Sequence, residues 1–184
     1  GKLKNEVSAE IASILAFAAI KNNDKIGLIV FSDKIEHTIP PKKGKAHIWN
    51  IIRTILNFKP EGKGTNISLP LEYLLNIQKR KATAFLISDF QDVNYEAKLK
   101  LAKQKHDLVA ISISDPREEA LPDVGLIQLE DAESGEILLV DTHDSEMTQK
   151  YTKQIQEQRE KRKTYFQSIG IDTIEIHTDR SLPE

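Results

Sequence analysis

"ATAFLISDF", residues 82–90, is the stretch that decides the fold. It is a continuous apolar run that ends in an aspartate and one further residue, and such runs are typical of a parallel strand buried on both faces. Two further runs, "KIGLIVFSD" (25–33) and "DLVAISISD" (107–115), have the same character and also reach an aspartate. Because helical segments separate them, the sequence predicts an α/β fold with a doubly wound, mostly parallel sheet and helices on both faces.

Apolar residues at helical spacing mark three helices before residue 80. In the first, which we expect to be buried against the sheet, they are Val7, Ile11, Ile14, Leu15 and Ala18, widened by Phe17 and Ala19. In the second they are Ile48, Ile51, Ile52, Ile55 and Leu56, and in the third Leu69, Leu71, Leu74, Leu75 and Ile77. Trp49 lies beside the second stripe and is expected in the core.

The other elements follow from simple signals. "IEHTIPP" (35–41) alternates and reaches two prolines, which predicts a short edge strand. "GLIQLED" and "EILLVD" flank "AESG" and predict an inserted hairpin over 124–141 with Gly135 at its turn. Helices are expected over about 95–105 and 145–168, the second ended by Gly170, and "IDTIEIHT" (171–178) is expected as the last strand.

Composition indicates one ordinary globular domain. The chain has 184 residues, 39% of them hydrophobic and 29% charged, and a net charge of −2 that gives no overall attraction to nucleic acid or membranes. Residues 34–63 carry seven Lys/Arg against two acids, and residues 115–146 carry eleven Asp/Glu against one arginine, which we interpret as solvated surface. The absence of cysteine excludes thiol chemistry and disulfides. No run approaches the roughly 18 apolar residues of a membrane span, so we expect a cytoplasmic location and no membrane contact.

Carboxylates follow the three buried strands at the edge where parallel sheets bind ligands. Ser32 and Asp33 follow the first strand, and Asp115 follows the third. Asp89 and Asp92 follow the second. One such aspartate usually caps a helix or forms a turn. Three strand ends with a carboxylate favour, modestly, a hard-cation site for Mg²⁺, Mn²⁺ or Ca²⁺.

The loop "GKGTNISLPL", residues 62–71, could bind phosphate, help to hold a metal, or only turn the chain into a helix. A phosphate loop needs a lysine directly before the hydroxyl residue, whereas here Gly64 separates Lys63 from Thr65. The phosphate interpretation is therefore weak. The five histidines are scattered without metal-ligand spacing, and neither G-x-S-x-G nor G-x-G-x-x-G occurs. Nothing interleaves aromatic and basic residues as nucleic-acid binding would require.

These stretches together resemble a von Willebrand factor A-like domain, and within that fold the bacterial group called domain-of-unknown-function family 58. "DKIGLIVFSD" is similar to the second strand of the fold, "GKGTNISLPL" to its glycine-threonine metal loop, and "FLISDFQD" to its fourth strand and metal aspartate. "SDPREEALPDVGLIQLEDAESGE" resembles the signature of the group itself. The likeness extends from about residue 3 to residue 178.

The resemblance implies a metal-ion-dependent adhesion site built from three loops. Thr65 matches the threonine of the second loop and Asp89 the aspartate of the third. Ser32 and Asp115 are possible neighbours. The Asp-x-Ser-x-Ser of the first loop does not occur in this sequence, and its strand is central in the order 3-2-1-4-5-6. We therefore expect an N-terminally truncated single domain, 1–184, without a tightly bound metal.

Removal of a central strand would expose the edges of the strands that end at Ser32 and Ser88. We expect upstream sequence, a strand swapped from another copy, or a rearranged sheet in which the two edges meet to fill the gap.

The resulting hypothesis is a non-enzymatic protein-interaction domain. A divalent cation, Mg²⁺ or else Mn²⁺ or Ca²⁺, would bind a partner carboxylate, and the resemblance implies that the partner is a MoxR-type AAA+ ATPase or its client. Two alternatives remain open at this point. One is an Mg²⁺-dependent phosphoryl-transfer or hydrolytic enzyme using Asp89, Asp92 and Asp115. The other is a structural domain without metal.

Overall fold

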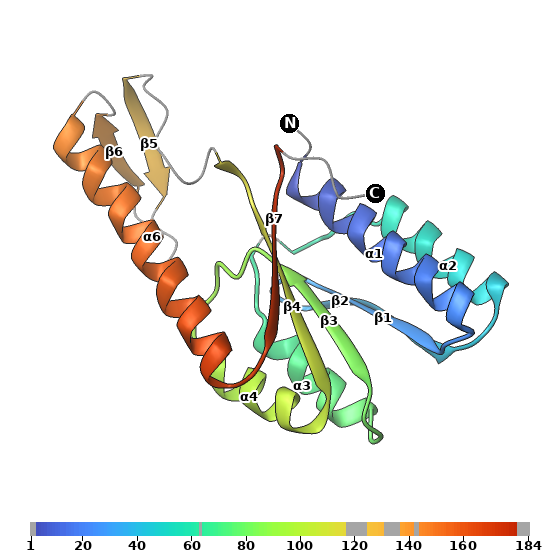
Figure 1. Ribbon diagram of the computed structural model, residues 1–184. Helices are drawn as coiled ribbons and strands as arrows, with labels where there is room; N and C mark the ends of the chain where they lie inside the picture. The colour runs from blue at the N-terminus through green and yellow to red at the C-terminus, as the bar shows by residue number, and fades with distance from the viewer. Residues whose placement is uncertain (1–2, 63, 117–124, 131–136, 142–143, 180–184) are drawn as a thin grey trace.

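A parallel sheet of three strands, in the order β3-β4-β7, forms the centre of the protein (Figure 1). The computed structural model describes residues 3–62, 64–116, 125–130, 137–141 and 144–179. The strands β3 (Thr83–Ser88) and β7 (Asp172–His177) lie on either side of β4 (Asp107–Ser114). Ser88 is level with Ser112 of β4, so the residues after β3 and β4 leave the sheet at the same edge. The predicted α/β class and these three strands are confirmed.

The apolar run of residues 26–31 is a strand, but it is not an interior parallel one. β1 (Ile26–Phe31) pairs antiparallel with β2 (Ile35–Lys42) in a separate sheet of two strands. The turn between them, residues 32–34, is too short for the crossover that parallel neighbours need. The prediction of β2 as an edge strand is confirmed, whereas a single continuous sheet is not found among the described residues.

The free edges of β1 and β3 do not pair with each other. Each strand has one ladder partner among the described residues, β2 for β1 and β4 for β3. Of the three expected ways to fill the gap, the rearranged sheet in which these two edges meet is therefore wrong. Side chains connect the two sheets instead, because Phe31 at the end of β1 packs against the core cluster that contains Leu86 of β3.

Helices cover both faces of the parallel sheet. On one face α1 (Lys4–Asn22) buries Val7 and Ile11 against Ile111 and Ile113 of β4. On the other face α3 (Ser68–Ile77), α4 (Glu96–Lys105) and α6 (Ser145–Ser168) enclose the largest cluster. The clustered side chains are Ile67, Leu71, Leu86, Phe90, Tyr95, Leu99, Ala102, Leu108, Ala110, Phe166 and Ile171. A third cluster joins α1 and α2 (Lys45–Asn57) to the β1–β2 sheet through Ala16, Ile39, Ile48, Ile51 and Ile52.

Several apolar residues expected in the core are exposed instead. They are Ile14 and Phe17 of α1, Trp49 and Leu56 of α2, and Ile77 of α3. Each helix buries only the stripe that its sheet covers, and these residues lie beyond that stripe. The prediction that Trp49 belongs to the core is wrong, since its side chain is 54% exposed.

One polar ring is enclosed near the end of α4. His106 is 1% exposed, and neither ring nitrogen has a hydrogen-bond partner among the described residues. Burial lowers the pKa of this imidazole from 6.5, and the neighbouring Lys105 charge acts in the same direction. Burial therefore favours the neutral form of His106.

The hairpin and the long helix are confirmed. β5 (Leu126–Glu130) pairs antiparallel with β6 (Ile137–Asp141), and the predicted turn at Gly135 lies outside the described residues. Asp144 caps the first turn of α6, and Gly170 has a φ of 70° just beyond its end. Figure 1 shows the hairpin beside the start of α6, away from the central sheet. Within the described part of the chain no helix has the length and apolarity needed to cross a membrane.

Candidate functional site

Three loops meet at the carboxyl edge of the strands. They follow β1 (residues 32–34), precede α3 (residues 58–62 and 64–67) and follow β3 (residues 89–95). The loop before α3 contains the predicted threonine, Thr65, whose side chain is exposed. Direct bonds to both of the other loops hold it in place.

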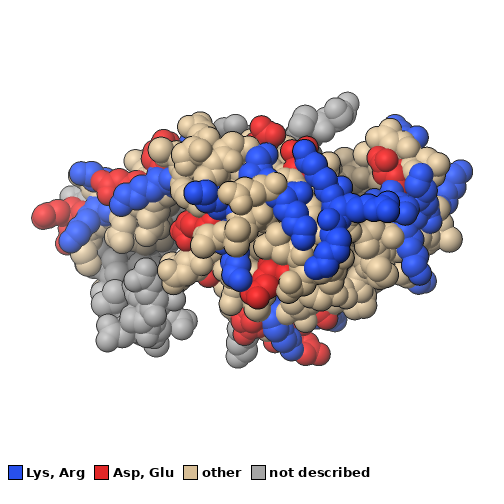
Figure 2. Space-filling model, turned by 90° about the horizontal axis from the view of Figure 1, so that it is seen from below, with Lys and Arg blue, Asp and Glu red and all other residues tan. Residues whose placement is uncertain are grey.

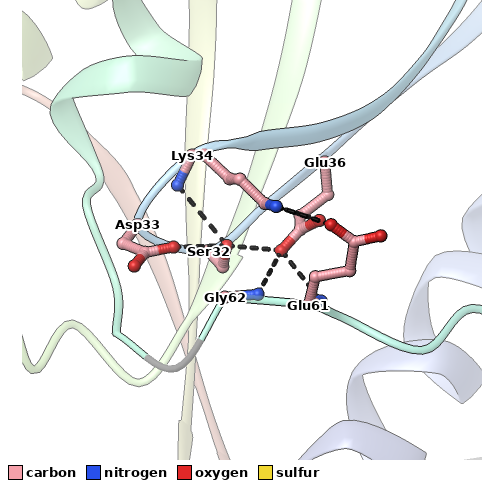
Figure 3. A network of polar contacts seen from close by, with 6 residues as sticks. All are labelled: Ser32, Asp33, Lys34, Glu36, Glu61 and Gly62. Carbon is pink, nitrogen blue, oxygen red and sulfur yellow. Dashed lines mark hydrogen bonds and ion pairs between the residues drawn. The ribbon is translucent and has the colours of Figure 1, made fainter.

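A buried carboxylate fixes one side of this loop (Figure 3). The Oε1 atom of Glu36 accepts hydrogen bonds from Ser32 Oγ at 2.6 Å, from the backbone N–H of Gly62 at 2.8 Å and from that of Glu61 at 3.1 Å. The Glu36 side chain is 3% exposed. The hydrogen bond from Ser32 and those from the loop backbone hold the pKa of Glu36 below its usual range. The buried charge is thereby stabilised where it joins β2 to the loop.

The charge of Lys34 completes this network. Its Nζ lies 2.7 Å from Glu61 Oε2 and 3.9 Å from Glu36 Oε2. The hydrogen bond to Glu61 raises the pKa of Lys34. The loop approaches so closely that a Cβ atom at Gly62 would overlap Ser32 Oγ and Asp33 Oδ1. Glycine is therefore required at this position for the contact.

The other side of the loop is held by the residues that follow β3. Asp92 Oδ2 accepts a hydrogen bond from the backbone N–H of Ile67 at 2.7 Å, and its Oδ1 accepts one from Val93 at 2.7 Å. The backbone N–H of Asn66 donates to the Ser32 carbonyl at 2.9 Å. Thr65 thus lies in a loop that bridges the ends of β1 and β3. Asp92 serves to fix this bridge rather than standing free at the edge.

Asp89 is paired with a lysine from the first helix. Its Oδ2 lies 2.8 Å from Lys4 Nζ, and its Oδ1 accepts a hydrogen bond from the backbone N–H of Gln91. A cation at Asp89 would therefore compete with the Lys4 ammonium group. Only Asp89 and Thr65 match the ligands that the resemblance implies, and they suit a hard cation in kind but are too few to hold one alone.

Arg162 of α6 supports the turn after Asp89. Its Nη1 donates to the Asp89 carbonyl at 3.2 Å, and its Nη2 donates to Ser112 Oγ at 3.3 Å. Its guanidinium carbon lies 5.6 Å from the centre of the Phe90 ring. Phe90 has a φ of 57°, an unusual value for a residue other than glycine, so the turn depends on such contacts. Burial lowers the pKa of Arg162.

Ser32 and Asp115, which the sequence analysis named as possible neighbours of the metal ligands, follow different strands. Ser32 is buried and donates its hydroxyl to Glu36. Asp115 directly follows β4, the strand next to β3, and is also buried. Across the described ranges no group of three or more His, Asp or Glu side chains is arranged to hold a metal ion. The predicted closeness of Thr65 and Asp89 stays a prediction, although their loops are joined through Asp92 and Ile67.

Sequence reasoning missed Lys4, Glu36 and Arg162. The third could have been found, because Arg162 lies on the same helical face as Phe166, four residues later, and Ile169, seven residues later. A charged residue on an apolar stripe indicates a buried contact. Lys4 and Glu36 gave no comparable signal, since each is one polar residue in a helix or strand where such residues are common.

The fold and the three joined loops define an α/β domain with a polar site at the carboxyl edge of its strands. The sequence model of the family described as "Protein of unknown function DUF58" matches residues 1–161, and the chain belongs to this family. Uncharacterized proteins of Mycobacterium tuberculosis (Rv1480) and Mycobacterium bovis (Mb1516) are each 28% identical over 135 residues. That region is 72% of this chain and 43% of each relative, so the chain spans less than half of their length.

Two solved structures share the fold. One is described as the conserved hypothetical protein BatB from Bacteroides thetaiotaomicron, with a TM-score of 0.52 and 15% identity. The similarity covers 92% of this chain and 80% of that one. The other is described as an aerotolerance-related membrane protein from Bacteroides fragilis, with a TM-score of 0.52, 14% identity, and coverage of 92% and 81%. At this identity the similarity concerns the fold alone.

Proposed function

We propose that the chain is a non-enzymatic, von Willebrand factor A-like interaction domain that binds a protein partner at the carboxyl edge of its strands. The observation that carries this proposal is the bridging loop, held by Glu36 on one side and by Asp92 on the other. It joins three loops into one preorganised surface, which reduces the entropy lost on binding. Ser32 and Asp92 are used in holding loops, which fits a binding surface better than a catalytic centre.

Asp89 and Thr65 are the proposed ligands of a divalent cation at this surface, Mg²⁺ or else Mn²⁺ or Ca²⁺. Their oxygens are of the kind that hard cations take, and the remaining ligands come from water, from the partner or from groups outside the described residues. When bound, the cation supplies an open coordination position for a partner carboxylate. When no cation is bound, the Lys4 ammonium group balances the charge of Asp89.

The proposed partner is a MoxR-type AAA+ ATPase or its client, in the cytoplasm. This assignment rests on the family resemblance, and the loop geometry adds only that the partner meets a polar, preorganised surface. An exposed glutamate or aspartate on the partner is the chemistry that this surface fits.

The test measures binding of the MoxR-type ATPase to the chain by calorimetry, with Mg²⁺ and with a chelator. Asp89→Asn and Thr65→Val are expected to remove the Mg²⁺-dependent part of the affinity. Asp107→Asn is the matched control, since Asp107 begins β4 at the opposite edge of the sheet. Equal binding in chelator would refute the metal role. Mg²⁺-dependent phosphatase activity that Asp89→Asn abolishes would instead support the enzyme alternative.

A further inference from the structure

Eight exposed basic residues surround the amino edge of the strands, opposite the polar site. They come from three short segments, residues 21–25, 42–45 and 79–81, which contain one acid, Asp24. These residues, called here the basic edge patch, are Lys21, Lys25, Lys42, Lys43, Lys45, Lys79, Arg80 and Lys81. From the sequence we interpreted the positive charge of residues 34–63 as solvated surface, and only Lys42, Lys43 and Lys45 of the patch belong to that range. The other five residues join them through the fold.

Strand register brings the three segments together. Lys25 directly precedes β1, and Ile26 pairs with Lys42 at the end of β2. Residues 79–81 lead into β3, and Figure 1 shows β1 and β3 starting at the same side of the molecule, at the lower right. Figure 2 shows the molecule from below, and its Lys and Arg side chains are densest in the right half, which corresponds to the side where β1 and β3 start.

The part of the protein that the structure describes leaves the basic edge patch without ion pairs. Nearby lysines differ in this respect, since Lys103 pairs with Asp107 and Lys105 donates to the Leu75 carbonyl. Unpaired like charges at one edge repel one another and leave a positive surface that can attract an external anion.

An exposed aromatic pair adjoins the patch. Phe17 and Trp49 are 41% and 54% exposed, and their rings meet edge to face with centroids 5.3 Å apart. Lys21 lies four residues after Phe17 on α1, and Lys45 lies four residues before Trp49 on α2. Residues four apart share one face of a helix, so lysines border the aromatic pair on both helices.

We propose that the basic edge patch and the Phe17–Trp49 pair dock on the surface of an anionic lipid bilayer. Lysine carries a compact point charge on a flexible stem, which suits many headgroups, whereas recognition of one carboxylate or phosphate favours the planar arginine fork. Seven of the eight residues are lysine. Tryptophan and phenylalanine at the border of such a patch suit the headgroup level of a bilayer. This proposal replaces the expectation of no membrane contact and is independent of the proposed function.

Docking in this way would orient the molecule. Parallel strands begin at the amino edge and end at the carboxyl edge, so a bilayer at the basic edge patch leaves the loop with Thr65 facing the aqueous side. The polar site and the lipid surface would not compete for the same residues.

Trp49 reports directly on docking because it is the only tryptophan in the chain. Fluorescence of the full chain is measured with vesicles of equimolar phosphatidylcholine and phosphatidylglycerol, and with vesicles of phosphatidylcholine alone. We expect a blue shift, protection from a soluble quencher and co-sedimentation with the anionic vesicles only, all weakened by added salt. No response to anionic vesicles, or an equal response to neutral ones, would overturn the proposal.

Charge variants test the patch itself. One lysine or arginine near an anionic leaflet strengthens binding about fivefold, so Lys79→Gln, Arg80→Gln and Lys81→Gln together should weaken it about a hundredfold. The control neutralises three exposed lysines of α6, Lys150→Gln, Lys161→Gln and Lys163→Gln, with the same change in net charge. Circular dichroism checks folding. If the triple variant does not fold, Trp49→Ser tests the aromatic pair by co-sedimentation, since it removes the fluorophore, and should weaken binding to the anionic vesicles. Equal loss in both triple variants, or tighter binding to duplex DNA without a Trp49 shift, would refute lipid docking.

Discussion

Replacement of Gly62 by alanine tests whether the loop that carries Thr65 is held as tightly as its contacts indicate. The added Cβ would overlap Ser32 Oγ and Asp33 Oδ1 and would lie 2.8 Å from Ser32 Cβ. Asp33 is exposed and can rotate away at little cost. Ser32 is buried at the end of β1 and cannot rotate without cost. Rotation of its hydroxyl would break the bond to Glu36 and would still leave its Cβ in place.

The overlap of the new Cβ with Ser32 can be relieved in two ways, and both cost a similar amount of folding free energy. A shift of the loop is an overpacking cost of about 1–3 kcal/mol. Rotation of Ser32 loses a hydrogen bond to a charged group, worth about 1.5–3 kcal/mol. We therefore expect Gly62→Ala to lower the free energy of unfolding by about 2 kcal/mol, which corresponds to a fall of about 4–8 °C in Tm for a domain of this size.

Urea denaturation followed by circular dichroism measures this change. Gly64→Ala is the matched control in the same loop, since its Cβ would meet only Asp33 Cβ at 3.7 Å, an ordinary contact. That variant is expected to be neutral or more stable by up to about 1 kcal/mol, because alanine restricts the unfolded chain. Equal stability of the two variants would show that the loop is not held against Ser32, and the preorganisation argument would be wrong.

Three further predictions concern the core, the site and pH. Phe166→Ala should lower stability by about 3–5 kcal/mol, because the buried Phe166 ring packs against Phe90 at 5.2 Å, and a loss below about 1 kcal/mol in thermal or urea denaturation would contradict this core. Lys4→Met should tighten Mg²⁺ binding at Asp89 by up to about fivefold in calorimetry, since it removes a half-buried ion pair worth about 1 kcal/mol, and weaker binding would show that Lys4 supports the site. Because burial lowers the pKa of His106, the unfolded chain takes up its proton first as pH falls below 6.5, so stability is lost from that pH down to the folded pKa. His106→Leu should remove this part of the pH dependence in urea titrations at pH 7 and pH 5, and an unchanged slope would contradict it.

The sequence predicted the elements better than their assembly. Continuous apolar runs marked β1, β3 and β4, and helical spacing marked α1 to α3, because burial imposes these local patterns wherever an element packs. Pairing is a non-local property, so the run of residues 26–31 could not show that β2 is the one ladder partner of β1 among the described residues. Ile14 and Trp49 were misplaced for the same reason, since the width of a buried stripe depends on what covers the helix.

The site was predicted in its parts and not in its connections. Asp89 and Thr65 were found because strand ends and a glycine loop have recognisable patterns. Asp92 was assigned to a possible metal site, whereas it holds the backbone of Ile67. Its bonding partner is a backbone group 25 residues away, which carries no side-chain signature in the sequence.

The separate pairing of β1 and β3 has a consequence for amide hydrogen exchange. Along a strand, successive backbone N–H groups point to opposite sides. Those of β3 that face β4 are bonded in the ladder, whereas those on its other side have no ladder partner among the described residues. The same holds for β1 beside β2. Both strands should therefore show alternating slow and fast exchange from one residue to the next, in contrast to β4, which has a partner on each side and should be protected throughout.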